Sequence, residues 1–389
     1  MKKVIITGVT GQDGSFMADY LLKNTDHAII AGARRLSVTN HKNIEHLKNN
    51  PRFKLIDLDI TDPQNIEEVI RNEQPDYFIN FAANSFVGNS WTMPINHMNT
   101  NCMAVLYQLE AIRKFAPHCR YYNAGSSEEF GDVVTVPQSE EHPIRPRSPY
   151  GAAKAAARHL VKVYRDSYGI YAIQGWLFNH EGTRRGEEFV TRKITKNVAR
   201  IKYAIENKLP FEPLKLGNLE SKRDWSDAED FMDGVWKMLN QDANHLKGDF
   251  EDFNFHYQHD GQNPTSSQRE SEWLSKRIKE YVLSSNETHS IKEFVELAFK
   301  AAGIEGVWVG EKLEELYLLP NYLADFAEFA SIKLVEIDPQ FYRPAEVELL
   351  LGDSIKARQE LGWKPKTSFK NLIDKMIKND ILLLDGKEE

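Results

Sequence analysis

Two side chains four positions apart, Tyr150 and Lys154, have the types and the spacing for proton transfer. The alanine-rich segment from Ser148 to Tyr168 predicts a helix, on which positions i and i+4 share a face. A neighbouring ammonium group and the positive nicotinamide of a bound cofactor would lower the pKa of a tyrosine, which makes it a usable base for a sugar or alcohol hydroxyl. The pair alone is common on surface helices, so its meaning depends on what accompanies it.

Three further polar side chains, Ser126, Glu128 and Glu129, follow an apolar run at residues 121–124. The carboxyl ends of parallel strands open onto the ligand crevice, so we expect Ser126 to hydrogen-bond the hydroxyl being oxidised. Glu128 is placed to remove a proton from the carbon beside a newly formed ketone, which a plain dehydrogenase does not need. Glu129 is a competing candidate, and either glutamate could instead cap a turn. Ser126 and Glu128, together with Tyr150 and Lys154, therefore predict an oxidation followed by an elimination.

A glycine-rich turn near the N-terminus is typical of a dinucleotide site. Residues 7–15 read TGVTGQDGS, between an apolar strand and a helical pattern. The first glycine permits a tight turn, the second lets the backbone approach a pyrophosphate, and the third allows close helix packing at a terminus that attracts anions. The residues expected to contact the cofactor here are Gly8, Thr10, Gly11, Gln12, Asp13 and Gly14.

The end of the second apolar run bears on the choice of dinucleotide. It leads into Arg34 and Arg35, where an acidic residue would bind a ribose 2′-hydroxyl and arginine would accept a 2′-phosphate. NADP is therefore the predicted cofactor, although two arginines at a strand end can also form a solvated loop. Asp59, after the third run, is either a partner of the adenine amino group or a solvated turn acid.

The elements that must position these residues alternate in type. Apolar runs at 4–7, 28–31, 53–57, 77–81 and 121–124, separated by helical intervals, predict an α/β fold with a doubly wound parallel sheet of the Rossmann type. Beyond about residue 180 the regular alternation of strands and helices gives way to longer helical patterns, which predicts a smaller C-terminal α/β substrate domain. Residues 1–180 form the expected NADP-binding domain and 181–389 the nucleotide-sugar-binding domain, with a boundary that can be interleaved. The later helices are expected at 189–207, 227–239 and 291–302.

Residues 246–280 are a polar insertion in the second domain, rich in aromatic side chains that a disordered spacer would lack. Phe253, Phe255 and Tyr257 alternate along the chain as in a half-buried strand. The spacing of Trp273, Leu274 and Ile278 suggests one apolar face of a short helix. The insertion either shapes the sugar pocket or, the alternative we favour, packs away from it as a surface module.

Composition narrows the possible partners and the compartment. The 389 residues carry 49 Lys and Arg against 57 Asp and Glu, so no general basic field attracts nucleic acid or an anionic membrane. Two cysteines favour a reducing compartment and argue against a cysteine-built metal site. No apolar segment approaches the ~18 residues of a membrane span. We expect a soluble, cytoplasmic protein.

Taken in order, the motifs resemble those of the GDP-mannose 4,6-dehydratases, which are extended short-chain dehydrogenases/reductases. They are TGVTGQDGS at 7–15, SSE at 126–128, SPYGAAK at 148–154, LFNHE at 177–181, RRG at 184–186, FVTRK at 189–193, KRDW at 222–225, ETHS at 287–290 and YRPAEV at 342–347. The resemblance runs from the first strand to about residue 380. Such a series in matching order is more specific than any one motif.

The resemblance implies roles position by position. Ser126 stands where the family usually has threonine, Glu128 is the acid/base, and Tyr150 with Lys154 completes the catalytic group and contacts the cofactor. The other implied cofactor contacts are Ser85, His180 and Arg185. The implied substrate contacts are Ser85, Asn179, Val190, Lys193, Arg223, Arg343 and Glu346, with the cationic groups on the diphosphate and Glu346 on guanine or ribose.

The implied reaction converts GDP-D-mannose, or a close GDP-sugar, to its 4-keto-6-deoxy product by internal hydride transfer through NADP and loss of water. Asn84-Ser85-Phe86 replaces the common Gln-Ser-His beside the sugar. This change and the insertion leave the identity of the sugar undecided, so a GDP-manno-heptose 4,6-dehydratase is an alternative. A nucleotide-sugar epimerase and an inactive NADP-binding sensor are weaker ones. The resemblance also implies a homo-oligomer, a dimer or tetramer, with residues 36–43 near a subunit contact.

Overall fold

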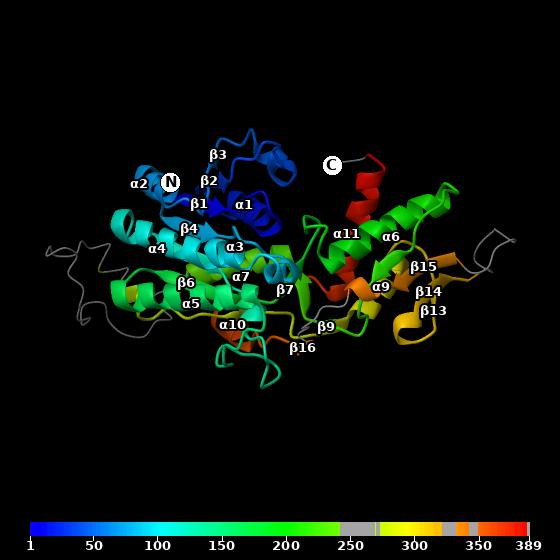
Figure 1. Ribbon diagram of the computed structural model, residues 1–389. Helices are drawn as coiled ribbons and strands as arrows, with labels where there is room; N and C mark the ends of the chain where they lie inside the picture. The colour runs from blue at the N-terminus through cyan, green and yellow to red at the C-terminus, as the bar shows by residue number, and fades with distance from the viewer. Residues whose placement is uncertain (242–268, 270–272, 321–331, 342–348, 387–389) are drawn as a thin grey trace.

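The computed structural model describes residues 1–241, 269, 273–320, 332–341 and 349–386. They form two lobes that lie side by side (Figure 1). No helix among these residues is long and apolar enough to cross a membrane.

The first lobe is built on a seven-stranded sheet in which every neighbouring pair is parallel. Its strands are β1 (Lys3–Thr7), β2 (Ala28–Ala33), β3 (Phe53–Asp57), β4 (Tyr77–Asn80), β5 (Arg120–Ala124), β6 (Ala172–Leu177) and β11 (Val282–Leu283). The order β11-β6-β5-β4-β1-β2-β3 reverses direction between β1 and β4. This confirms the doubly wound sheet, whose ligand crevice lies at the carboxyl ends of the strands beside that reversal.

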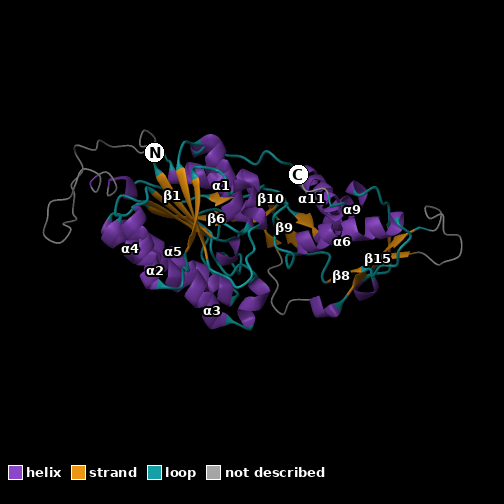
Figure 2. Ribbon diagram, turned by 90° about the horizontal axis from the view of Figure 1, so that it is seen from above, coloured by secondary structure: helices purple, strands orange, loops and turns teal. Residues whose placement is uncertain are grey.

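Helices cover both faces of the sheet because side chains alternate along its buried strands. Val4 and Ile6 enter a core with the helices α1 (Gln12–Asn24) and α7 (Ala228–Leu239). Ile5, between them, enters a second core on the opposite face. That face is covered by α2 (Pro63–Glu73), α4 (Ala104–Phe115) and α5 (Pro149–Tyr168), as Figure 2 shows.

Helix α5 has the bounds that its sequence predicts. The Ser148 side chain accepts a hydrogen bond from the backbone N–H of Gly151 at 3.0 Å, and Pro149 occupies the first turn. Gly169 ends the helix in the left-handed conformation, with φ of 65°. These caps fix where the helix starts, and therefore which turn carries Tyr150 and Lys154.

The second lobe packs three helices against a four-stranded sheet of order β13-β14-β15-β8. The helices are α6 (Val190–Glu206), α9 (Ile291–Ala301) and α11 (Phe369–Leu384). The strands are β8 (Leu214–Leu216), β13 (Val307–Val309), β14 (Leu316–Leu319) and β15 (Ile332–Ile337).

Two small sheets and several short helices complete the described fold. The sheets are β7 (Asn179–Glu181) with β10 (Trp225–Asp227), and β9 (Lys222–Arg223) with β12 (His289–Ser290) and β16 (Leu349–Leu350). The short helices are η1 (Lys42–Leu47), η2 (Val87–Trp91), α3 (Pro94–Met98), η3 (Asn99–Met103), η4 (Ser127–Glu129), η6 (Lys312–Glu314), η8 (Pro339–Phe341) and α10 (Ile355–Glu360).

Segments from the second half of the chain return to the first lobe, so a single boundary after residue 180 is crossed. Helix α7 covers the large sheet, and β11 extends it beyond β6. Trp273, Leu274 and Ile278 of the expected insertion are buried in the same core, and residues 273–275 are helical. The other expected set, Phe253, Phe255 and Tyr257, lies outside the described residues.

Candidate active site

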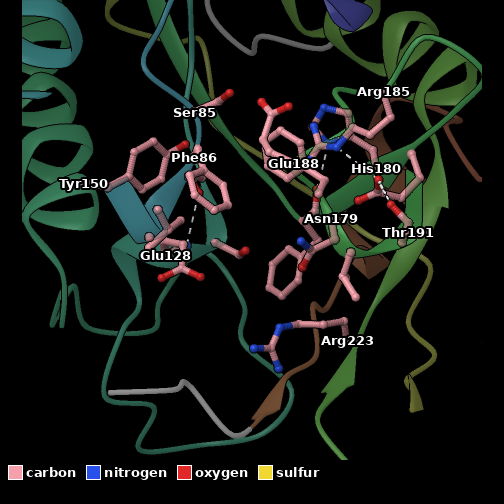
Figure 3. A pocket seen from close by; sticks show the side chains of 18 of the residues that line it. Ser85, Phe86, Glu128, Tyr150, Asn179, His180, Arg185, Glu188, Thr191 and Arg223 are labelled. Carbon is pink, nitrogen blue, oxygen red and sulfur yellow. Dashed lines mark hydrogen bonds and ion pairs between the residues drawn. The ribbon is translucent and has the colours of Figure 1, made fainter. Parts of the chain in front are cut away.

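A cavity of about 730 Å³ opens between the two lobes. Its walls come from the ends of β4 and β5, from the start of α5, and from the start of α6 with β9. Twelve residues singled out from the sequence line it: Asp13, Ser85, Ser126, Glu128, Tyr150, Lys154, Asn179, His180, Arg185, Val190, Lys193 and Arg223. In Figure 3, Tyr150 and Glu128 lie on one side of this pocket, and His180 and Arg185 on the other.

The glycine-rich turn lies where β1 passes into α1. Gly8 has φ of +67°, and a Cβ there would lie 2.7 Å from the backbone N of Ala82. A Cβ on Gly14 would lie 2.4 Å from the Gly8 carbonyl oxygen, so the helix packs directly on the turn. The N–H of Gly11 donates to the same oxygen at 3.0 Å. A tight turn with glycine at its closest approaches, at the N-terminus of a 13-residue helix, fits a dinucleotide pyrophosphate.

Two neighbours of that turn are held by contacts across the structure. Gln12 Nε2 donates to the backbone oxygen of His180 at 3.1 Å. The Thr10 carbonyl oxygen accepts from Asn43 Nδ2 at 2.9 Å. The turn is thereby tied both to β7 and to the segment that follows β2.

Arg34 and Arg35 directly follow β2, beside the turn, because β2 pairs with β1. Both are exposed. Asp59 is different, because its Oδ1 accepts from the N–H and the hydroxyl of Thr61 at 2.9 and 2.7 Å. That carboxylate closes a turn, and its contact with the adenine amino group stays a prediction.

The turn after β5 separates the two candidate glutamates. Ser126 precedes η4, and its hydroxyl accepts from the Glu128 N–H at 3.2 Å. Glu128 lines the cavity. Glu129 is fully buried, does not line it, and pairs with Arg158 at 2.5 Å. Glu128 is therefore the glutamate in position to meet a ligand.

Tyr150 and Lys154 are buried side by side at the start of α5, with 7% and 4% of their surface exposed. Lys154 Nζ donates to the Ala124 carbonyl oxygen at 2.8 Å and lies 5.9 Å from the centre of the Tyr150 ring. Burial lowers the pKa of Lys154 to about 8. Burial also raises the pKa of Tyr150, and it outweighs the Ser126 hydrogen bond, which lowers it. Desolvation of the phenolate therefore dominates in the protein alone, and the lowering of this pKa by the ammonium group together with a bound, positively charged nicotinamide stays a prediction.

An ion pair fixes the opposite wall. His180 Nε2 lies 2.9 Å from Asp13 Oδ2, and its Nδ1 lies 2.7 Å from the backbone oxygen of Phe178. Burial raises the pKa of Asp13, but the charge and hydrogen bond of His180 outweigh it and lower the pKa to about 2. Burial lowers the pKa of His180, and Asp13 outweighs this and raises it. The pair joins the start of α1 to β7.

Arg185 is held by its own segment. Its Nε lies 3.0 Å from Glu181 Oε2, and its guanidinium stacks 3.6 Å from the centre of the Phe189 ring. The Thr191 hydroxyl donates to the same carboxylate oxygen at 2.5 Å. The guanidinium is thus anchored on one edge while the side chain lines the cavity.

The far end of the cavity is cationic. Lys193 Nζ lies 3.4 Å from the centre of the Phe341 ring, and burial lowers its pKa. Arg223 is 9% exposed and donates to the Lys222 carbonyl oxygen at 2.7 Å. Asn179 Oδ1 is buried with no hydrogen-bond partner among the described residues, so it has an unmet acceptor at the cavity. Arg343 and Glu346 lie outside the described residues.

The cavity has an aromatic wall, of which sequence reasoning placed only Phe86 beside the sugar, through the resemblance, and gave no role to Phe189 or Phe341. Phe86 and Phe189 line it and meet edge to face, with ring centres 5.9 Å apart. Phe341 adds a third ring beside Lys193. Phe86 follows Ser85 and Phe189 precedes Val190. Their position in the sequence next to two expected substrate contacts is the signal that could have placed them at the site.

A profile of the family described as GDP-mannose 4,6 dehydratase matches residues 5–256 and 270–376. The chain belongs to the GDP-mannose 4,6-dehydratase family. The unmatched residues 257–269 fall within the expected insertion. A GDP-mannose 4,6 dehydratase from Drosophila melanogaster is 38% identical, over 98% of this chain and 87% of that protein. The human GDP-mannose 4,6 dehydratase is 35% identical, over 98% and 91%.

Solved structures confirm the fold of this GDP-mannose 4,6-dehydratase family member. Pal from Bacillus thuringiensis superposes with a TM-score of 0.73 at 19% identity, covering 98% of this chain and 99% of Pal. A dTDP-glucose 4,6-dehydratase from Bacillus anthracis, in complex with NAD, gives 0.71 at 20% identity, covering 97% and 96%. The doubly wound sheet with its second lobe is thus shared across sequences that have diverged widely.

Proposed function

We propose that this chain is an NADP-dependent GDP-mannose 4,6-dehydratase, a hydro-lyase that forms GDP-4-keto-6-deoxy-mannose. The observation that carries the proposal is the presence of Glu128 in the same cavity as Tyr150 and Lys154. A second acid/base group beside the tyrosine is what elimination requires and simple oxidation does not. The names of the relatives, given above, support the same substrate.

The residues that would hold the dinucleotide are the turn at Gly8, Gly11 and Gly14, together with His180 and Arg185. When bound, NADP supplies a hydride acceptor and returns the hydride later in the cycle. Arg34 and Arg35 are the proposed partners of the 2′-phosphate, since their exposed cationic groups lie at the end of β2.

Tyr150 is proposed to take the proton of the C4 hydroxyl, while Ser126 holds that hydroxyl by a hydrogen bond. Burial raises the pKa of Tyr150 in the protein alone, so proton transfer needs additional positive charge near the phenol. Lys154, whose Nζ is fixed on the Ala124 carbonyl oxygen, is held nearby.

Glu128 is proposed to act once C4 is a ketone. A ketone acidifies the neighbouring C5 proton, and the Glu128 carboxylate removes it, so that water can leave from C6. Its backbone N–H is held by the Ser126 hydroxyl, which keeps the carboxylate on the turn that faces the sugar end of the cavity.

The cationic end of the cavity is the proposed site for the diphosphate of the GDP-sugar. Lys193 and Arg223 supply the charges, and Asn179 offers its unmet acceptor to a ligand donor. Phe86, where the family commonly has histidine, lines the same cavity and meets Phe189 edge to face. A GDP-manno-heptose is therefore the second substrate to be tested.

The test is incubation of the purified protein with GDP-mannose and, separately, with a GDP-manno-heptose, followed by mass spectrometry. We expect loss of the mass of one water from GDP-mannose. Loss only from the heptose would move the assignment to that sugar, and a product of unchanged mass would select an epimerase. No change in any GDP-sugar by a protein that binds NADP would contradict the proposal.

The cytoplasmic location and the homo-oligomer stay predictions. Leu36 and Val38, in the segment expected near a subunit contact, expose 46% and 84% of their surface. Apolar side chains so exposed are available for a contact between copies of this chain.

A further inference from the structure

The buried face of α5 extends one turn beyond the two residues given a chemical role. Tyr150, Lys154 and Arg158 follow one another at intervals of four, so they lie on one face of the helix. Arg158 is 4% exposed and does not line the cavity. A buried guanidinium with no ligand to meet needs an explanation, because burying a charge is costly unless it is paired.

Arg158 is paired with two glutamates. Its Nε lies 2.5 Å from Glu129 Oε2, and its Nη1 lies 2.6 Å from Glu280 Oε2. Nη1 also donates to the Gln174 carbonyl oxygen at 2.7 Å, and the guanidinium stacks 3.5 Å from the centre of the Trp176 ring. The group is fixed on several sides.

Glu129 reaches both segments of the proposed active site. Its Oε1 accepts from the backbone N–H of Ser126 at 2.8 Å, which closes the turn that carries Glu128. The same oxygen accepts from Gln174 Nε2 at 3.0 Å, and that amide also donates to the backbone oxygen of Lys154 at 3.0 Å. One fully buried carboxylate thus holds the turn directly and α5 through Arg158 and Gln174.

The turn is shaped around this ion pair. A Cβ on Gly125 would lie 2.1 Å from the Gly175 carbonyl oxygen on β6, and 2.9 Å from both Arg158 Nη2 and Glu129 Oε1. The backbone between β5 and Ser126 therefore passes close to the pair, and only a glycine leaves the room.

We propose that Glu129 and Arg158 are positioning residues, which set the relative placement of Glu128 on the η4 turn and of Tyr150 and Lys154 on α5. This inference rests on the proposed function and deepens it. Without the pair, the turn and the helix keep the hydrogen bond from Lys154 Nζ to the Ala124 carbonyl oxygen but lose the buried ion pair that fixes the η4 turn, so Glu128 is held less firmly relative to the tyrosine.

Glu280 provides the matched comparison. It also binds Arg158, and its other oxygen lies 2.8 Å from Arg165 Nη1, but none of its described contacts reaches the η4 turn. Glu129→Gln and Glu280→Gln each remove one carboxylate from the same guanidinium. Only the first removes it from the segment that carries Glu128.

The experiment measures water loss from GDP-mannose for both variants. We expect Glu129→Gln to lower kcat by about tenfold to a hundredfold, with KM within about threefold of the unaltered protein, because small misplacements of reacting groups cost rates of that order. Glu280→Gln is expected to lower Tm while kcat changes less than about threefold. Equal kcat losses in the two variants would overturn the proposal.

The pH profile gives a readout that a purely structural role would not move. The charge of Glu129 raises the pKa of both Tyr150 and Lys154. Its removal is therefore expected to shift the rising acidic limb of kcat to lower pH in Glu129→Gln, and to leave it in place in Glu280→Gln. An unshifted limb in Glu129→Gln would count against the proposal.

A double variant separates positioning from stability. Replacing a buried ion pair by apolar side chains is often neutral or stabilising, and Glu280 keeps its ion pair with Arg165 when Arg158 is replaced. The double variant Glu129→Met with Arg158→Met is therefore expected to have a higher Tm than Glu129→Gln. Its kcat is expected to stay low, because the Ser126 N–H still lacks its carboxylate. Recovery of both Tm and kcat in the double variant would show that Glu129 and Arg158 have only a structural role.

Hydrogen exchange tests the positioning even if no GDP-sugar is turned over. Amides of residues 125–129 are expected to exchange faster in Glu129→Gln than in Glu280→Gln, with the rest of α5 unchanged. Inactivity of the unaltered protein would defeat the proposed function alone, whereas unchanged exchange in this segment would defeat the positioning pair.

Discussion

The catalytic turn with α5 and the end of β2 are two regions of one site that differ in how firmly their side chains are held. Tyr150 and Lys154 are more than nine-tenths buried, and the Lys154 ammonium is fixed on a backbone oxygen. Arg34 and Arg35 are exposed at the edge of the glycine-rich turn. One region is organised before any ligand arrives, and the other is solvated.

The difference follows from what each region has to do. Proton transfer depends on distances and angles, so its groups need support from packing and hydrogen bonds in advance. Recognition of a phosphate depends on charge, and the ligand itself brings the partner that orders an arginine. Changes in the first region should therefore alter rate, and changes in the second should alter cofactor affinity and selectivity.

The largest expected effect is that of Tyr150→Phe, which removes the proposed base and leaves the ring. We expect kcat for water loss to fall by about 10³-fold, within the range for loss of acid–base catalysis. The measurement is the initial rate of product formation from GDP-mannose, with binding of NADP followed separately.

A matched control for that variant is Tyr122→Phe. Tyr122 is fully buried on β5, does not line the cavity, and its hydroxyl has no hydrogen-bond partner among the described residues. Its loss is expected to leave kcat unchanged. If both substitutions reduced kcat alike, the special role of Tyr150 would be refuted.

A smaller effect is expected at the end of β2. The double variant Arg34→Ala with Arg35→Ala should weaken NADP binding by about tenfold to a hundredfold, which corresponds to the loss of one charge-assisted hydrogen bond to the 2′-phosphate. NAD binding is the internal control and should be nearly unchanged. Titrations showing equal losses for both dinucleotides would mean that the arginines do not meet the 2′-phosphate.

The smallest effect is expected at the Asp13–His180 pair, which lies on the wall opposite the catalytic turn. The pKa of Asp13 is lowered from 3.8, so its contribution to stability is present above about pH 4 and is lost as the pH falls towards about 2. The pKa of His180 is raised from 6.5, so its contribution is present below that value and is lost as the pH rises through the raised pKa. The pair is therefore fully stabilising between about pH 4 and 6.5.

Asp13→Asn should lower Tm by about 2 °C at about pH 5.5 and by less at about pH 9. Thermal unfolding followed by circular dichroism measures both. Asp374→Asn, which breaks an exposed pair with Lys370, is the control and should change Tm little at either pH. A loss of Tm at Asp13 that does not depend on pH would show that the pair carries no net charge coupling.

Local spacing was enough to predict much of the fold and of the site. The first five strands, α5 with its caps, and the glycine-rich turn follow from patterns within a few residues. The resemblance placed Phe86 beside the sugar, but its contact with Phe189 was not predicted, because the two residues are distant in the sequence and no periodicity marks a cavity. The raised pKa of Tyr150 in the protein alone could not be read from the sequence, because burial is a property of the folded chain and outweighs the hydrogen bond from Ser126.

The sequence by itself determined the parts that depend on neighbouring residues: the tight turn at Gly8, the i, i+4 pairing of Tyr150 with Lys154, and the alternation that builds a parallel sheet. Only the tertiary structure decided which glutamate faces the cavity, because Arg158, 29 positions along the chain, binds Glu129 and leaves Glu128 at the cavity wall. It also decided that residues 282–283 complete the large sheet, and that His180 pairs with Asp13. These outcomes depend on which distant side chains are buried together, and local patterns do not specify that.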